Sequence, residues 1–389
     1  MKKITALKQG IAACAMVMAC ALAPQVHAQQ GVPTSGAVAD RAHMSNGGDA
    51  DRVTDEIKSY NDFTSAGGKY VEMSAKDEVA QMGAGVNVIA GWDGYWNGGS
   101  TKFKLSQIRK IKEAGFNTVR IPIQTFAPGA THIDTQGHLD PKFFQKLDDV
   151  VEAALSAKLF VIIDDHDYDN CSKDADACAQ ILPNVWYELS EHYKNAPSSV
   201  MFELLNEPHD KVDAAIWNAW IPDLVAIVRQ TNPTRNIVIG PTHWNSLGDL
   251  PQLKLPDDKH IIVTFHYYDP MPFTHQGATW VGPEIEKERG EVHWKGTPEE
   301  LAKINSDFDQ VAAWAKANDR PILLGEYGTY GKYSAMDERA AWTRAVTKAA
   351  ADRGFARAAW YFSSTDGFGI FDVDKGQWVD PIKDAYLAK

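Results

Sequence analysis

The chain has 389 residues, of which 44% are apolar and 23% are charged. This length suits two average domains or one large α/β barrel of roughly 250 residues with appendages. The formal net charge of −12 argues against nucleic acid or an anionic membrane as a partner, because both bind basic surfaces, and it favours a neutral substrate over an anionic one.

The first 28 residues have the three parts of a secretory signal peptide. Three lysines lie within the first eight residues, an apolar run covers 11–22, and the small-residue site Val-His-Ala ends at Ala28. We therefore predict cleavage after Ala28 and a secreted or periplasmic protein. The apolar run is too short to anchor the chain by spanning a membrane, and no later segment is apolar enough to do so. A lipobox ending at Cys20 is the alternative.

Residues 29–73 are rich in Gly, Ser, Ala, Asp and Thr and contain few large apolar residues. A segment of this composition cannot bury enough apolar surface to fold alone. We predict a flexible polar leader, with room for part of it to pack on the outside of the domain that follows.

From residue 74 to residue 389, short apolar runs alternate with helical periodicity. Continuous apolar runs are typical of parallel strands buried on both faces, and they cover 85–90, 116–122, 159–166, 200–207, 236–240, 261–268, 321–326 and 357–364. Between them, three apolar stripes have helical spacing: Leu105, Ile108 and Ile111; Ile216, Trp220, Leu224, Val225 and Val228; and Leu301, Ile304, Phe308 and Val311. Gly115 ends the first stripe.

Eight strands separated by helices predict a (β/α)8 TIM barrel as the catalytic domain, residues 74–389. A doubly wound sheet would usually have fewer strands. The chain also has no glycine-rich phosphate loop after the first run, which weakens a nucleotide-binding interpretation.

Two cysteines remain once the signal peptide is removed, Cys171 and Cys178, in the polar stretch "NCSKDADACA". In an oxidising compartment such a close pair predicts a disulfide. Zinc is the rival interpretation, but two cysteines without a nearby histidine make a poor zinc site.

Polar and aromatic side chains follow or end most of the predicted strands, where a TIM barrel has its active site. They are Arg120, Asp164, Asp165, His166, Asp167, Asn206, Glu207, His243, Trp244, Asn245, His266, Tyr268, Glu326 and Trp360. Taken singly, each is more often a solvated or structural group. A whole ring is harder to explain in that way, because buried charges are costly unless they pair or act on a ligand.

Glu207 and Glu326 end the fourth and seventh predicted strands, on opposite sides of the barrel. Cleavage of a glycosidic bond uses one protonated carboxyl that gives its proton to the leaving oxygen and one ionised carboxylate that faces the anomeric carbon. A neighbouring cation lowers a carboxylate pKa, so we expect Arg120 to hold Glu326 ionised. Unlike environments of this kind separate an acid from a nucleophile.

Five segments carry most of this ring: "GFNTVRIP", "ELLNEPHD", "TFHYYDP", "LLGEYGTYG" and "WYFSSTDGFGIFD". Together, and in this order between about Met82 and Tyr386, they resemble glycoside hydrolase family 5, the retaining β-glycanases that include many bacterial cellulases. The resemblance implies Glu207 as acid/base and Glu326 as nucleophile. It also implies supporting roles for Arg120 and Tyr268, which would hold Glu326; His266, which would support the pair; Asn206, which would bind the sugar 2-hydroxyl; His166, which would touch the −1 sugar; and Trp360, which would be its stacking floor.

Two departures from the family pattern lie near the sugar subsites. Asp167 stands where many members have a second histidine, and "IAGWDGYWNGG" stands where many have a Gly-Asn-Thr segment. Both bear on the choice of substrate.

Five tryptophans in or near the predicted top-face loops offer flat rings for stacking on sugars: Trp92, Trp96, Trp244, Trp280 and Trp294. We expect about half of them to be packing residues, and we place Trp92, Trp244 and Asn245 among the substrate-binding residues. The acidic residues after the third strand suggest calcium, which takes oxygen ligands, but EF-hand spacing is absent from the sequence and we predict no metal site.

We predict a retaining endo-β-1,4-glucanase that acts as a monomer on β-glucan polysaccharide or oligosaccharide without a cofactor. Within the family, β-mannanase, xyloglucanase and licheninase are the alternatives. From other classes, a catalytically silent carbohydrate-binding barrel conflicts with the intact pair of glutamates. A metal-dependent barrel hydrolase would need more strand-end histidines than His166 and His266.

Overall fold

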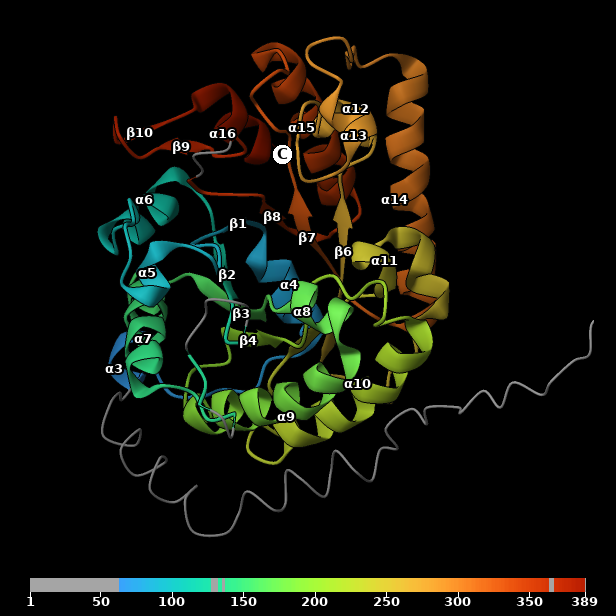
Figure 1. The fold of residues 1–389 in the computed structure, drawn as a ribbon. Helices are drawn as coiled ribbons and strands as arrows, with labels where there is room; N and C mark the ends of the chain where they lie inside the picture. The colour runs from blue at the N-terminus through green and yellow to red at the C-terminus, as the bar shows by residue number, and fades with distance from the viewer. Residues whose placement is uncertain (1–62, 127–131, 135–136, 364–366, 389) are drawn as a thin grey trace, which may run out of the picture. The chain divides into compact units, whose positions relative to one another are not determined.

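Eight parallel strands close into a barrel in the computed structural model, each paired with the next along the chain and β8 with β1 (Figure 1). They are β1 (Ala84–Asn87), β2 (Thr118–Ile123), β3 (Phe160–Asp165), β4 (Val200–Glu203), β5 (Ile237–Ile239), β6 (Ile261–Tyr267), β7 (Ile322–Tyr327) and β8 (Ala356–Ala359). Each strand overlaps one of the apolar runs in the sequence, so the predicted (β/α)8 barrel is confirmed.

The structure describes residues 63–126, 132–134, 137–363 and 367–388. The predicted signal peptide, residues 1–28, and the predicted leader up to residue 62 lie outside these ranges. At the end of the leader, Phe63 is buried with its ring 5.2 Å from that of Tyr193. The Tyr70 hydroxyl lies 2.9 Å from Thr234 Oγ1. The last residues of the predicted leader therefore pack on the barrel domain.

Burial on both faces explains why the strand runs are apolar throughout. Every residue of β2, β4, β6 and β7 is buried. Near the amino ends of the strands, an apolar cluster joins Ile162, Met201, Val238, Ile262, Leu323 and Ala356 to Ala75, Val79 and Met82 of α4 (Ala75–Met82). Helix α4 thus closes the amino end of the barrel, which leaves the carboxyl ends of the strands to carry a site.

Helices follow the strands and lie around the ring (Figure 1). The longer ones are α6 (Ser106–Ala114), α7 (Pro141–Ser156), α9 (Ala175–His192), α10 (Ala214–Arg229), α14 (Pro298–Asn318), α15 (Met336–Asp352) and α16 (Asp380–Tyr386). The predicted stripes face the core except at their first residues: Leu105 and Leu301 are exposed, because both lie at the amino end of their helix. Gly115 ends α6 at φ 111°, as predicted. Across the described ranges, no helix combines the length and apolarity needed to cross a bilayer.

Short elements complete the loops between these helices and strands. They are α3 (Thr64–Gly67), α5 (Gly94–Asn97), α8 (Tyr168–Lys173), α11 (Thr242–Asn245), a 3₁₀ helix (Leu247–Gln252), α12 (Met271–Thr274), α13 (Pro283–Glu286) and the hairpin β9 (Phe371–Asp372) and β10 (Gln377–Trp378). Helices α8 and α11 follow β3 and β5 at the carboxyl end of the barrel.

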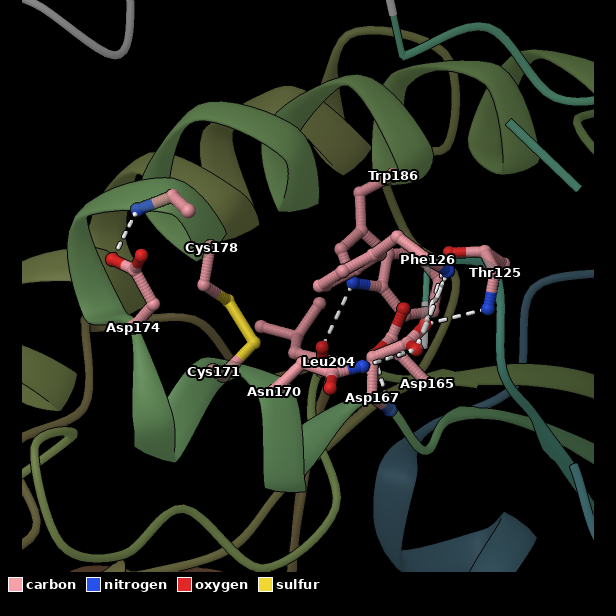
Figure 2. Close-up of a disulfide and its surroundings, with 11 residues drawn as sticks. Thr125, Phe126, Asp165, Asp167, Asn170, Cys171, Asp174, Cys178, Trp186 and Leu204 are labelled. Atoms are coloured by element: carbon pink, nitrogen blue, oxygen red, sulfur yellow. Dashed lines mark hydrogen bonds between the residues drawn. A yellow bond between two sulfur atoms is a disulfide. The ribbon is translucent and has the colours of Figure 1, made fainter. Parts of the chain in front are cut away.

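The predicted disulfide is present between Cys171 of α8 and Cys178 of α9, whose Cα atoms are 4.9 Å apart (Figure 2). Both cysteines are buried. The Asp174 carboxylate caps α9 between them by accepting from Ala177 N at 3.1 Å. The bond ties together the two helices that follow β3, next to the strand end that carries His166.

Candidate active site

The side chain of Arg120 lies in the middle of β2 and is fully buried at the centre of the site. Its guanidinium donates to oxygens from β1, β4, β7 and the loop after β4: Glu203 (2.7 and 2.9 Å), Asn87 (2.8 Å), Glu326 (2.8 Å) and Asn206 (2.8 Å). It also forms an ion pair with Asp164 of β3 at 3.0 Å. A buried cation is tolerated only when its donors and its charge are satisfied in this way. One side chain therefore ties four other strands to β2.

Glu326 on β7 is held through both carboxylate oxygens. Arg120 Nη1 donates to Oε1 at 2.8 Å and the Tyr268 hydroxyl donates to Oε2 at 2.9 Å. Burial raises the pKa of Glu326 above its ordinary value, while His266 and Arg120 oppose the rise. The expectation that the Arg120 cation would lower this pKa is wrong in direction, because burial outweighs the cation.

Glu207 reaches the site from the loop after β4 rather than from the strand. Strand β4 ends at Glu203, and Glu207 has a left-handed backbone with φ 40°. The turn directs its carboxyl to His266, whose Nδ1 lies 2.6 Å from Oε1. Burial raises the pKa of Glu207 to about 8, against the opposing charges of Arg120 and His209. Glu207 therefore holds its proton at neutral pH.

The two carboxyl groups face each other across a short gap. One oxygen of Glu207, one oxygen of Glu326 and a ring nitrogen of His266 all lie within 4.8 Å of one another. Retaining glycosidases have carboxyl groups about 5–5.5 Å apart, whereas inverting ones need about 6.5–9.5 Å to admit a water. The spacing matches retention. A metal ion at these atoms would be repelled by the positive charge of Arg120. It would also compete with the hydrogen bonds that Arg120 and Tyr268 donate to Glu326.

One side of the site is a group of rings around His166. His166 Nδ1 lies 2.7 Å from Asp164 Oδ2, and burial lowers the pKa of His166 to about 3, so this imidazole is neutral. Its ring lies parallel to that of Trp360, at 5.8 Å and 6°. Trp92 is 54% exposed, and its ring lies 6.1 Å from His166 and 6.3 Å from Trp360. Of these three rings, that of Trp92 is the most exposed.

Helix α11 brings Trp244 and Asn245 to the site, and only one of them can touch a ligand. Trp244 is 48% exposed and stacks on His209 at 4.5 Å and 21°. Asn245 is fully buried, with Nδ2 3.2 Å from His266 Nε2. The structure corrects the predicted substrate-binding role of Asn245, because its amide lies behind His266.

The remaining tryptophans divide as expected between surface and core. Trp280 is 57% exposed and meets Tyr330 edge to face. Trp96 and Trp294 are buried, so these two are packing residues rather than platforms for a sugar.

Asp167 is a structural residue in the loop after β3. Its Oδ2 accepts from Thr125 N at 2.6 Å and from Thr125 Oγ1 at 3.0 Å (Figure 2). Its own backbone N–H donates to Asp165 Oδ1 at 3.1 Å. These bonds tie the loop after β2 to the loop after β3, and they engage Asp165 and Asp167, two of the acidic residues that suggested calcium in the sequence.

Three residues of the site are absent from the prediction: Asn87, Glu203 and His209. Asn87 Nδ2 donates to the carbonyls of Gly325 and Ala359 at 3.0 and 3.1 Å, which joins Arg120 to β7 and β8. Glu203 had a usable signal, since a glutamate inside the apolar run 200–205 needs a buried cation. His209 had none, because its bond to the Glu207 carbonyl, 2.8 Å from Nδ1, depends on the turn.

The sequence is similar to known glycoside hydrolases. A family model described as Cellulase (glycosyl hydrolase family 5) matches residues 79–366. Endoglucanase H of Acetivibrio thermocellus is 31% identical over 300 residues, which are 76% of this chain and 31% of that protein, so the chain spans about a third of this relative's length.

Two solved structures cover most of the chain. A hyperthermophilic endo-beta-1,4-glucanase in complex with substrate is 35% identical, with a TM-score of 0.76 over 82% of this chain and 100% of that chain. Endoglucanase Cel5A from the hyperthermophilic Thermotoga maritima is 31% identical, with a TM-score of 0.74 over 81% and 100%.

We predict that Arg120→Met lowers the free energy of unfolding by about 3–5 kcal/mol at pH 8, because it leaves Glu203 and Glu326 buried without their cation. The loss should be smaller at pH 5. Unpaired buried carboxyls have raised pKa values in the folded state, so their contribution to stability falls as pH rises. Urea unfolding at both pH values measures the effect. Arg120→Lys, which keeps the charge, is the control, and an equal loss at both pH values would contradict the prediction.

Proposed function

The chain belongs to the cellulase family, glycosyl hydrolase family 5, and from this premise we propose that it is a retaining endo-β-1,4-glucanase. It hydrolyses internal bonds of β-glucan by double displacement. The observation that carries the proposal is the pair Glu207 and Glu326, with oxygens within 4.8 Å and different partners. The names of the similar endoglucanases support the substrate class.

In the first step, a Glu326 oxygen attacks the anomeric carbon and the bond to the leaving oxygen breaks. Arg120 and Tyr268 orient this carboxylate. Glu207, whose pKa is raised to about 8 by burial, gives its proton to the leaving oxygen, and a glycosyl ester forms on Glu326.

In the second step, the Glu207 carboxylate takes a proton from water, and the water oxygen attacks the anomeric carbon and releases Glu326. The charge of Glu207 raises the pKa of Glu326, so the two carboxylates repel each other. Esterification removes one of the two charges, which makes the ionised form of Glu207 more favourable when it must act as a base.

Asn206 is placed to bind the sugar 2-hydroxyl. Its Oδ1 accepts from Arg120 Nη2 at 2.8 Å, while its buried Nδ2 has no hydrogen-bond partner among the described residues. A hydrogen bond to the 2-hydroxyl strengthens in the transition state of retaining enzymes. His166, Trp360 and Trp92 would contact the sugar on one side of the scissile bond, and Trp244 would contact it on the other.

We further propose that the protein works as a monomer in a secreted or periplasmic location. The signal-like residues 1–28 and the disulfide, which suits an oxidising compartment, support the location. The net charge of −12 supports a polysaccharide rather than nucleic acid as partner.

Reducing-sugar release from carboxymethylcellulose, mannan, xyloglucan and mixed-linkage glucan tests the substrate class and the role of the pair. We expect the highest rate on a β-1,4-glucan. Glu207→Gln should lower that rate by about 10²–10⁴-fold because the proton donor is lost, and Glu326→Gln should leave almost none. Glu299→Gln, an exposed glutamate on α14, is the matched control and should be fully active. A fully active Glu326→Gln enzyme that folds normally would refute the assignment.

The pH dependence of kcat/KM should have an alkaline limb near pH 8. Glu207 acts as an acid only when protonated, and burial raises its pKa to about 8, so activity falls as pH rises through that value. Initial rates on cellotetraose measure this limb. With 2,4-dinitrophenyl β-cellobioside, whose leaving group needs no proton, the limb should be weaker. A half-maximal loss near pH 5 on cellotetraose would contradict the prediction.

A further inference from the structure

Three consecutive residues of α11 have a left-handed backbone: His243, Trp244 and Asn245, with φ of 52°, 58° and 53°. None is glycine. The left-handed conformation is unfavourable for L-amino acids other than glycine and normally occurs at single positions. A turn of three such residues persists only when its surroundings hold it, which points to a functional reason for its shape.

Asp249 in the 3₁₀ helix holds this turn closed. Its Oδ2 accepts from Thr242 Oγ1 at 2.7 Å and also contacts His243 Nδ1. Its Oδ1 accepts from Gln252 Nε2 at 3.1 Å. Gly240 makes room on the other side, because a Cβ there would lie 2.1 Å from Asn245 Oδ1. The contacts of Asp249 and the space beside Gly240 together place the Asn245 amide in the wall of the barrel.

The buried Asn245 amide reaches the back of His266. Asn245 Nδ2, which can only donate, lies 3.2 Å from His266 Nε2. Burial lowers the pKa of His266 to about 4, so the ring is neutral and carries one proton. Since Nε2 accepts, that proton is on Nδ1, which lies 2.6 Å from Glu207 Oε1 and 3.7 Å from Glu326 Oε2.

We propose that Asn245 is a positioning residue for the general acid: it fixes the tautomer of His266, so that the Nδ1–H always faces the Glu207 carboxyl. The inference rests on the proposed function and extends it beyond the residues that touch a sugar. A hydrogen bond from Nδ1 stabilises the ionised form of Glu207 and eases the release of its proton. With the other tautomer, Nδ1 would accept from protonated Glu207 and hold the proton back.

The titratable and charged groups that interact with Glu207 all bear on this balance. They are Arg120 from β2, Asp164 from β3, Glu203 from β4, His209 from the loop after β4, His266 from β6, Tyr268 from the loop after β6, Glu326 from β7, and Tyr168 and Asp169 from α8. A change at Asn245 removes none of them. The Asn245 amide reaches the Glu207 carboxyl through the His266 ring.

Two variants test the role by kinetics. Asn245→Ala removes the donor, and the nearly isosteric Asn245→Asp replaces it with an acceptor, which favours a proton on Nε2. For both, we expect kcat on cellotetraose to fall about 10-fold per folded molecule, KM to change less than 2-fold, and the alkaline limb to move to higher pH. Gly240→Ala, which displaces the amide without touching its chemistry, should move the limb in the same direction.

Controls separate positioning from structural and binding effects. Asn232→Ala removes a buried asparagine that accepts from Arg235 Nε at 2.7 Å, away from the site, and should lower stability without moving the limb. Trp244→Ala, on the same turn, should raise KM instead. If Asn245→Ala and Asn245→Asp raise KM with the limb unmoved, Asn245 binds substrate and the proposal is wrong. Unchanged kcat and limb in both variants would overturn it equally.

The tautomer of His266 can be measured without an activity assay, by ¹⁵N–¹H correlation spectra of the histidine side chains. We expect His266, assigned by the loss of its signals in His266→Gln, to carry its proton on Nδ1 in the wild type and on Nε2 in Asn245→Asp. A wild-type proton on Nε2 would refute the inference. A wild type that releases no sugar from any β-glycan would refute the proposed function, while the spectra would still decide the role of Asn245.

Discussion

The buried Arg120 guanidinium holds the barrel and the site together through hydrogen bonds and ion pairs. It joins β2 to Asn87, Asp164, Glu203 and Glu326 on four other strands. A cation in the interior is stable only with such partners, so the closure of the barrel and the placement of the Glu326 carboxyl depend on the same contacts. The site cannot lose this residue without leaving carboxylates buried and unpaired.

The two glutamates have different hydrogen-bond partners because their backbones lie in different elements. Glu326 comes from inside a strand and meets two fixed donors, Arg120 and Tyr268. Glu207 comes from a left-handed turn beyond its strand and meets a neutral imidazole. Burial raises both pKa values, but Glu207 has no direct bond from a cation and its pKa rises to about 8. Position in the chain thus gives the two carboxyl groups different partners.

Much of this could be predicted from the sequence, because the eight apolar runs report burial on both faces and the motifs carry the ring residues in order. The features that the sequence did not predict depend on where individual side chains lie, and a sequence pattern does not show this. Asn245 looks like a residue of the cleft, yet the turn clamped by Asp249 buries it behind His266. Asp167 looks like a subsite residue, yet it accepts from Thr125. The sequence predicted a lowered pKa for Glu326, whereas burial raises it. A motif can indicate a neighbouring cation, but it does not show how deeply a carboxyl group is buried.

In the proposed mechanism, Glu326 attacks the sugar while Glu207 transfers the proton. Trapping with a 2-deoxy-2-fluoro-β-cellobioside that carries a good leaving group tests it most directly, because the fluorine slows hydrolysis of the glycosyl ester. Mass spectrometry of the digested protein should find one fluorosugar adduct, on the peptide that contains Glu326. An adduct on Glu207, or turnover with no covalent adduct at all, would contradict the account.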